Sequence, residues 1–154
     1  MSTDTWYWED LKTGQVFTSP GRTVTETDIV NFAGLSGDYN EVHVNAAYAE
    51  STAFGERIAH GILGLSIASG LFTRTELVLR IQSNLVALLG LEWKFTGPVL
   101  IGDTIRLEAE ITDCRPTKDG KRGIIEVTRR VVNQRGEVVQ IGKTPLMLLR
   151  RTEG

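Results

Sequence analysis

The segment from residue 58 to about residue 80 constrains the fold of this chain more than any other segment. It reads IAHGILGLSIASGLFTRTELVLR, and its first half mixes glycine, serine and alanine with large apolar residues. A helix that is apolar on almost every side must be buried. Its small residues lower helix propensity, so close approach of another part of the backbone has to compensate. The segment therefore predicts a buried helix that lies against a curved sheet.

The sequence after residue 84 changes to the pattern of β-strands. One strand is predicted over residues 86–95. The next strand places four apolar residues on one face: Ile105, Leu107, Ala109 and Ile111. Turns at residues 118–120 and 133–136 separate two further strands. Helices followed by a run of antiparallel strands are typical of an α+β domain.

Polar residues organise the part of the chain that precedes the buried helix. Thr25 and Asp28 have the spacing of a capping box and predict the start of a helix. A loop is expected over residues 37–45, and Asn45 at its end is expected to cap a short helix. Residues 1–22 are expected to form an irregular lead-in.

Length and charge limit the classes of protein to consider. A chain of 154 residues suits one domain, here residues 1–154. Its 17 lysines and arginines against 19 aspartates and glutamates give a net charge of −2, which argues against a dedicated nucleic-acid-binding protein. The single cysteine, Cys114, excludes an internal disulfide and fits a reducing compartment. One cysteine and two histidines also make a closed structural zinc site unexpected.

Neither the amino-terminal sequence nor the longest apolar run predicts a membrane protein. The amino-terminal sequence, MSTDTWYWEDLKTG, lacks the basic region and apolar stretch of a signal peptide. The longest uncharged run, residues 61–73, is too short to span a bilayer and fits a buried helix instead. We therefore expect a cytoplasmic protein without a membrane segment.

The segment SGDYNEVHVNAAYA, residues 36–49, carries the strongest candidates for chemistry, Asp38 and His43. A carboxylate and an imidazole that contact one water molecule can remove a proton from it and return a proton elsewhere. Histidine suits this role because imidazole exchanges protons near neutral pH. From the spacing alone, the alternative stays open that Asp38 caps a turn and that His43 is a packed, hydrogen-bonded residue.

A second candidate is Gly61, which lies at the expected start of the buried helix after His60. The first amides of a helix are free donors at its positive end, and glycine lets a ligand approach them without a Cβ in the way. The Gly61 amide could therefore stabilise a developing oxyanion. The alternative is that Gly61 only relieves crowding between helix and sheet. His60 is interpreted as a structural hydrogen-bonding residue rather than a second base.

These segments together resemble a known family. SGDYN, then His43 and Ala49, is similar to the motif of (R)-specific enoyl-CoA hydratases, also called MaoC-like dehydratases or hydratase 2 proteins. FGERIAHGILGLSIASGL resembles the second block of that family, and GLEWKFTGPVLIGDTI resembles its strand, turn and Gly-Asp pair. The resemblance covers most of the chain from residue 22 onward. It implies a hot-dog fold, in which an antiparallel sheet wraps around one long central helix, and a homodimer formed through edge strands.

The resemblance also implies an activity, the reversible hydration of a trans-2-enoyl-CoA to an (R)-3-hydroxyacyl-CoA. Asp38 and His43 would activate the water, the Gly61 amide would serve as the oxyanion donor, and Asn40 and Ser69 would lie on the substrate side of the site. No metal and no redox cofactor are implied, because CoA enters as part of the substrate. The implied ligand is an acyl-CoA or acyl-carrier-protein thioester.

One position departs from the family pattern, because Glu41 stands where proline is usual. This change leaves Asp38 and His43 in place, so it bears on rate and specificity more than on reaction class. Two alternatives stay open: an acyl-CoA thioesterase on the same fold, and a non-catalytic acyl-thioester-binding subunit of a heteromeric dehydratase. The CoA phosphates would need local positive charge, for which four residues are candidates: Arg57, Lys118, Lys121 and Arg122.

Overall fold

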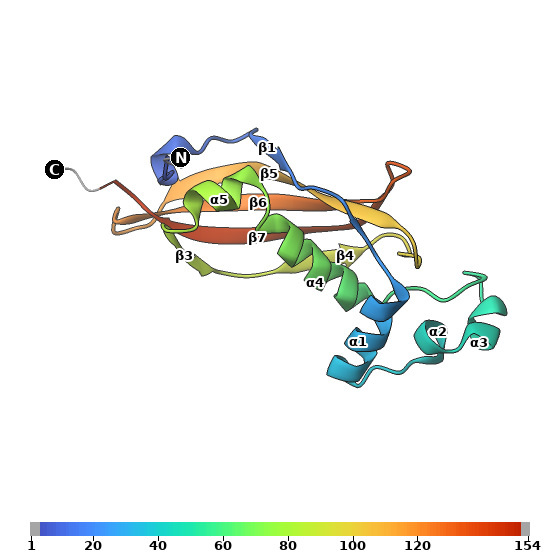
Figure 1. Ribbon diagram of the computed structural model, residues 1–154. Helices are drawn as coiled ribbons and strands as arrows, with labels where there is room; N and C mark the ends of the chain where they lie inside the picture. The colour runs from blue at the N-terminus through green and yellow to red at the C-terminus, as the bar shows by residue number, and fades with distance from the viewer. Residues whose placement is uncertain (1–3, 152–154) are drawn as a thin grey trace.

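Three long antiparallel strands form the body of the protein, which a computed structural model describes for residues 4–151 (Figure 1). These strands are β5 (Thr104–Pro116), β6 (Arg122–Val132) and β7 (Val138–Leu149). The predicted turns between them are confirmed, and each contains a glycine with positive φ, Gly120 at 68° and Gly136 at 80°. The apolar face of β5 predicted from the sequence is buried throughout.

Short strands extend the sheet on both sides, in the order β1-β5-β6-β7-β3, with β2 also on β5 and β4 also on β7. On the β5 side lie β1 (Val16–Thr18) and β2 (Arg22–Thr23), and a 3-10 helix, η1 (Trp8–Asp10), contacts β6. The prediction of an irregular lead-in is therefore wrong for these elements, while residues 1–3 lie outside the described residues. Strands of two or three residues are too short to show an alternating pattern in the sequence.

The β7 side of the sheet also differs from the prediction. Two strands form where one strand was expected over residues 86–95. They are β3 (Leu85–Leu88) and β4 (Glu92–Phe95), and both pair with β7. The interruption lies opposite Pro145 of β7, whose carbonyl accepts a hydrogen bond from the Leu89 amide at 2.9 Å. Proline has no N–H to donate to a ladder, so the pairing is broken at this point.

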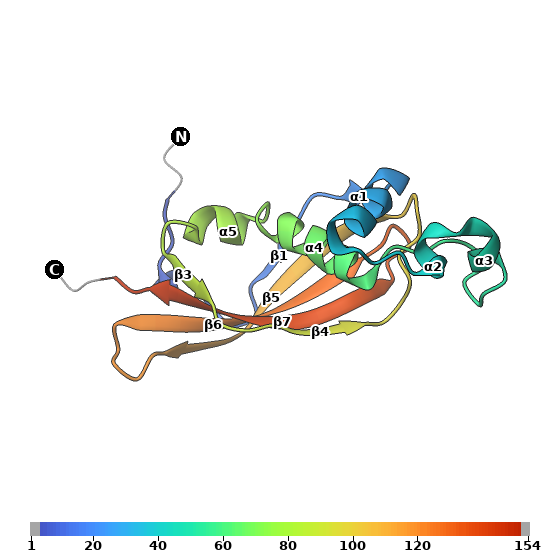
Figure 2. The same ribbon diagram turned by 90° about the horizontal axis from the view of Figure 1, so that it is seen from below.

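The buried helix lies across one face of the sheet (Figures 1 and 2). It is α4 (Gly61–Phe72), followed by α5 (Glu76–Ile81), so the single predicted helix from residue 58 to about 80 is wrong in both its start and its continuity. Thr75 separates the two helices, since its hydroxyl oxygen accepts a hydrogen bond from the amide of Val78 and caps α5. The sheet does pack against this small-residue helix as predicted, but α4 is buried on one face only, since Ile62, Ser66, Ser69 and Gly70 are exposed.

Three helices precede α4: α1 (Glu26–Ser36) lies beside the start of α4, whereas α2 (Glu41–Val44) and α3 (Ala46–Glu50) project beyond the end of the sheet (Figures 1 and 2). The predicted capping box of Thr25 and Asp28 is confirmed, as is the cap that Asn45 provides for α3. The prediction of a loop over residues 37–45 is wrong in its second half, where α2 forms. A helix of four residues is too short to produce a helical period in the sequence.

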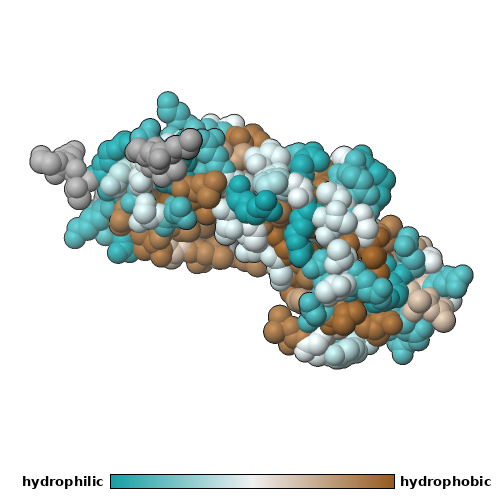
Figure 3. All heavy atoms as spheres, viewed as in Figure 1, coloured by the Kyte–Doolittle hydropathy of each residue, from teal (hydrophilic) through white to brown (hydrophobic). Residues whose placement is uncertain are grey.

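Among residues 4–151, no helix is long and apolar enough to cross a membrane. Large apolar side chains are nevertheless exposed along the β3–β4 edge of the sheet. They are Val86, Leu88, Leu89, Leu91 and Phe95, with exposed fractions from 39% to 57%. Figure 3 shows apolar surface in brown along the side of the molecule where β3 lies.

Candidate active site

Asp38 lies in the short connection between α1 and α2. Helix α1 ends at Gly37, whose φ of 75° lets the chain reverse without strain on a side chain. The Ser36 hydroxyl accepts the Asp38 amide hydrogen at 3.1 Å, and the Asp38 Oδ1 accepts the Asn40 amide hydrogen at 3.1 Å. The carboxylate is therefore held by one bond through one oxygen, and the side chain stays accessible at the surface.

His43 lies on α2, and its ring orientation is fixed by the chain that leads to α4. Its Nδ1 lies 2.8 Å from the carbonyl oxygen of Ile58. A carbonyl oxygen can only accept, so Nδ1 carries the proton in this contact and Nε2 of the neutral ring is left with a free lone pair. His43 therefore has the tautomer that a general base requires.

His60 comes directly before α4 and packs against His43. Its ring is stacked on the His43 ring with centroids 3.9 Å apart, and only 2% of the residue is exposed. The His60 Nε2 donates to the backbone carbonyl of Asp38 at 2.9 Å, which ties the Asp38 loop to the start of the helix. Its Nδ1 is buried and has no hydrogen-bond partner among residues 4–151.

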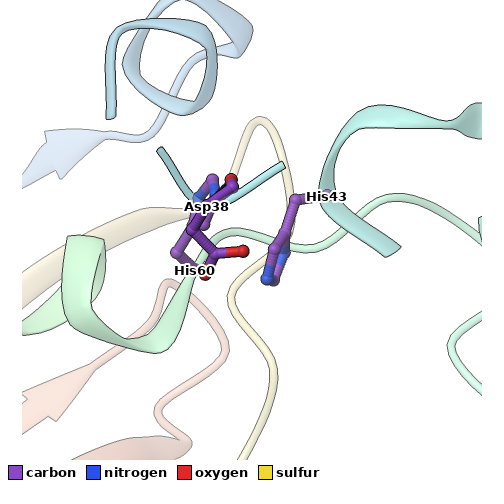
Figure 4. A group of neighbouring side chains, drawn as sticks. All are labelled: Asp38, His43 and His60. Carbon is purple, nitrogen blue, oxygen red and sulfur yellow. Dashed lines mark hydrogen bonds between the residues drawn. The ribbon is translucent and has the colours of Figure 1, made fainter. Parts of the chain in front are cut away.

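Asp38 from the α1–α2 connection, His43 from α2 and His60 from the start of α4 thus converge (Figure 4). One ligand atom from each lies within 4.8 Å of the other two. This separation leaves room for one small occupant that all three groups could contact. A water molecule suits it, and aspartate with two histidines is also a chemically suitable ligand set for a divalent metal ion.

A pocket of about 530 Å³ opens beside His43 and reaches the first residue of α4. This volume is typical of small-molecule sites. Gly61 lines the pocket against Phe95, and a Cβ on Gly61 would lie 2.9 Å from the Phe95 ring. The Gly61 amide is in the first turn of the helix, where amides have no intrahelical acceptor. Most of the remaining lining is apolar or small: Phe54, Ile58, Ala59, Gly97, Pro98 and Val99. Asp38 stands beside His43 but outside this lining.

Asn40 and Glu41 shape the backbone that carries His43. The Asn40 side chain accepts the amide hydrogen of Val42 at 3.3 Å and caps α2. Glu41 is the first residue of α2, a position where proline and acidic residues are both favoured. Its carboxylate accepts from the side chain of Asn45, the cap of α3. Glu41 therefore occupies a helix position that also suits proline, and its side chain links the two short helices.

Arg57, a candidate for binding the CoA phosphates, is instead engaged in contacts within the protein. Its Nε donates to the backbone carbonyl of His43 at 2.7 Å, and its Nη1 pairs with Glu26 at 2.6 Å. Arg57 thus fixes α2 against α1 and is not free for a phosphate. The other three candidate phosphate residues are also placed elsewhere, in or beside the β5–β6 turn at the opposite end of the sheet, where Arg122 pairs with Leu149.

Ser69 lies on the exposed face of α4, about 12 Å along the helix from Gly61. Among the described residues it lines neither the pocket beside His43 nor any hydrogen-bonded cluster with Asp38. Its assignment to the substrate side therefore stays a prediction, unlike the convergence of Asp38, His43 and the start of α4, which the structure displays.

Two residues at the start of α4, Gln140 and Gly64, are not predicted by the sequence motifs. Gln140 of β7 is 2% exposed and donates from Nε2 to the carbonyl of Gly61 at 3.1 Å, while its Oε1 accepts from Trp93 Nε1 at 3.0 Å. Gly64 provides the space, because a Cβ there would lie 2.3 Å from Gln140 Nε2. A large polar residue at an inward-facing position of β7 is the signal that identifies Gln140 in retrospect.

Solved structures establish the class of this fold. The chain superimposes with a TM-score of 0.82 on a Mycobacterium tuberculosis protein described as having a double hotdog fold, at 20% identity, covering 100% of this chain and 47% of that one. A monoamine oxidase regulatory protein from Archaeoglobus gives a TM-score of 0.90 at 34% identity, covering 99% of both chains. The protein therefore has the predicted α+β hot-dog fold.

The sequence comparisons give the family. The model of the MaoC-like domain matches residues 10–134, and the chain belongs to this family. An (R)-specific enoyl-CoA hydratase from Rhodospirillum rubrum is 40% identical over 112 residues, which are 73% of this chain and 74% of that protein. The family predicted from the residue motifs is thus confirmed.

Proposed function

We propose that this protein catalyses the reversible addition of water to a trans-2-enoyl-CoA, giving an (R)-3-hydroxyacyl-CoA. The observation that carries the proposal is the convergence of Asp38 and His43, within 4.8 Å of each other, beside a pocket that begins at the Gly61 amide. The family membership of the chain and its 40% identity to an (R)-specific enoyl-CoA hydratase support the same activity.

In the proposed mechanism, one water molecule is held between the Asp38 carboxylate and the Nε2 of His43. The water oxygen bonds to C3 of the enoyl group as the pair takes one proton, and the pair returns one proton to C2, so that one water is added across the double bond. The Ile58 carbonyl keeps the Nδ1 proton of His43 in place throughout.

The thioester oxygen becomes negatively charged as water adds, and it would accept a hydrogen bond from the Gly61 amide at the start of α4. Loss of one such donor commonly costs about 2.7–4 kcal/mol of transition-state stabilisation. Asn40 would contribute by capping α2, the helix that carries His43. The Glu41 carboxylate is hydrogen-bonded to the Asn45 side chain and not to the acid–base pair. This scheme uses no metal and no redox cofactor, and CoA or an acyl carrier protein delivers the acyl group.

The direct test is an assay of the purified protein with crotonyl-CoA. Loss of the enoyl absorbance without release of free thiol is expected. Release of free CoA would instead identify a thioesterase, and binding without turnover of any chain length would identify a non-catalytic subunit. Activity is expected to survive dialysis against a strong chelator, whereas its loss, with recovery on adding one divalent metal, would assign the Asp38–His43–His60 cluster to a metal ion.

We also propose that the active form is a homodimer joined along the β3–β4 edge. These strands pair with β7 on one side, and their other side carries the exposed apolar residues described above. Free strand edges and apolar patches both favour association. Phe95 belongs to this edge and also lines the pocket, so the dimer would complete the wall of the site.

A further inference from the structure

The pocket beside His43 ends close to the start of α4. Gln140 and Phe95 both line it, and they face each other as a cross-strand pair of β7 and β4. In the part of the chain that the structure describes, Gly61 is the only residue of α4 that lines this pocket. The pocket therefore does not continue along the helix, and an acyl chain that starts at the Gly61 amide meets the side chain of Gln140.

Trp93 occupies the next position along the same two strands, on the side away from the pocket. It pairs with Gly142 of β7, and its indole ring covers that glycine, because a Cβ on Gly142 would lie 2.1 Å from the ring. Gln140 and Gly142 are on the same face of β7, about 7 Å apart along the strand. The indole ring thus closes the path along β7 directly behind Gln140.

Hydrogen bonds hold these two side chains in place. The indole Nε1 of Trp93 donates to Gln140 Oε1 at 3.0 Å, and Gln140 Nε2 donates to the carbonyl of Gly61 at 3.1 Å. Gln140 is 2% exposed, so a rotation of its side chain would leave buried polar atoms unpaired. A polar network of this kind is rigid, whereas a flexible apolar side chain such as methionine adapts its shape to a ligand.

Two glycines provide the room that these side chains occupy. A Cβ on Gly64 of α4 would lie 2.3 Å from Gln140 Nε2, just as a Cβ on Gly142 would overlap the Trp93 ring. Glycine in the interior of a helix or strand costs stability, and close packing of a large side chain against it offsets that cost. The amide and the indole therefore occupy the route that an acyl chain would take along β7.

We propose that Gln140 and Trp93 form the floor of the acyl pocket and restrict the substrates to short enoyl thioesters, so that crotonyl and hexenoyl chains are accepted and octenoyl chains are rejected. The inference rests on the proposed hydratase function and specifies its substrate class. Gln140 binds the carbonyl of the residue whose amide would hold the thioester oxygen, so the floor lies close to the reacting carbons. A longer chain would have to displace a hydrogen-bonded side chain.

Binding of saturated thioesters, which cannot be hydrated, tests the floor separately from catalysis. The dissociation constants of butyryl-, hexanoyl- and octanoyl-CoA are measured by calorimetry with the wild-type protein. Octanoyl-CoA is expected to bind about tenfold more weakly than hexanoyl-CoA, although its larger apolar surface would favour it in an open pocket. Octanoyl-CoA binding as tightly as hexanoyl-CoA, or more tightly, would overturn the proposal.

Variants that remove the floor are expected to gain the longer substrate. Gln140→Ala combined with Trp93→Ala should raise the ratio of kcat/KM for trans-2-octenoyl-CoA to that for crotonyl-CoA by about ten- to a hundredfold over wild type. Damage to the fold would lower both values, so a raised ratio is not produced by a merely structural role. Lys94→Ala, on the opposite face of β4, should keep the wild-type ratio.

An unchanged ratio in the double variant contradicts the proposal. If the double variant does not fold, Gln140→Ala alone shortens the side chain that lines the pocket and is expected to raise the ratio severalfold. A ratio in Gln140→Ala that equals the ratio in Lys94→Ala counts against the floor.

Binding and hydration measured on the same wild-type protein separate the two levels of the inference. A protein that binds hexanoyl-CoA more tightly than octanoyl-CoA but hydrates no enoyl-CoA would refute the proposed reaction and retain the floor. A protein that hydrates crotonyl-CoA and trans-2-octenoyl-CoA with equal kcat/KM would retain the reaction and refute the floor.

Discussion

Two histidines at the site are each oriented by a backbone carbonyl, and this fixes which nitrogen of each ring can act. His43 donates to Ile58 through Nδ1, and His60 donates to Asp38 through Nε2. The remaining nitrogen of each neutral ring is an acceptor. The same two hydrogen bonds also tie α2 and the Asp38 loop to the segment that begins α4, so the chemistry and the local fold depend on the same contacts.

Substitution of the acid–base pair should remove activity without unfolding the protein. Asp38→Asn and His43→Gln keep side-chain size and are each expected to lower kcat for crotonyl-CoA by about 10²–10⁴-fold. Asp38 is exposed, so Asp38→Asn should leave the melting temperature close to that of the wild type. A variant that keeps near-normal turnover would show that its residue has no part in the acid–base step.

Gly61 can be tested against another glycine of the same helix. A Cβ at Gly61 would lie 2.9 Å from the half-exposed Phe95 ring, so Gly61→Ala should shift that ring and narrow the pocket. We expect kcat/KM to fall by about 10²–10³-fold if the thioester oxygen loses the amide contact. Gly70→Ala, with open space around the added Cβ, is expected to keep its activity. Equal activities of the two variants would argue against the oxyanion role.

At the level of elements, the turn before β5 is held by a buried acid. Asp103 accepts hydrogen bonds from the Leu100 amide, Gln134 and Arg135, and its side chain is 4% exposed. Burial opposes ionisation, but these hydrogen bonds outweigh it and hold the pKa of Asp103 below its usual value. The ionised form therefore stabilises the connection that carries the pocket residues between β4 and β5.

This depressed pKa predicts how stability depends on pH. Asp103 contributes stability above the pKa of an unfolded aspartate, about 3.9, and the contribution is lost as the pH falls through the lower pKa of the folded state. Asp103→Asn is expected to lower the free energy of unfolding by about 1–3 kcal/mol at pH 7. The difference from wild type should shrink in urea titrations as the pH falls below about 4.

Asp113→Asn serves as the control for that measurement. Asp113 forms an exposed ion pair with Arg115, in which both side chains are about half exposed. Such pairs contribute little to stability. If both variants lose the same free energy at pH 7, or if the effect of Asp103→Asn does not change with pH, the buried hydrogen bonds of Asp103 are not the stabilising feature.

At the level of the whole molecule, the sheet has two edges of different character. The β1 edge is short and exposes one large apolar side chain, Val16, whereas the β3–β4 edge exposes five. Leu88→Lys combined with Leu91→Lys is expected to convert the proposed homodimer to a monomer, because it places charges on the apolar edge. Val16→Lys is expected to leave the dimer intact. Sedimentation velocity measures both, and a monomeric wild-type protein would exclude the dimer.

The sequence by itself determined the general class of the fold and the family. The local spacing of Asp38 and His43 left a purely structural role open, and these residues and Gly61 became candidates for the site through the family resemblance. The alternating apolar residues of β5 were likewise readable because burial of one face imposes a period of two. These features depend on neighbours along the chain.

Only the tertiary structure decided the features that depend on residues distant in the chain. The break between β3 and β4 follows from Pro145, about fifty-five residues later, because pairing with that residue removes a hydrogen bond. The stacking of His60 on His43 and the contact of Gln140 with Gly61 have the same origin. Periodicity reports which face of an element is buried, but the partner that meets that face is set by the packing of the whole chain.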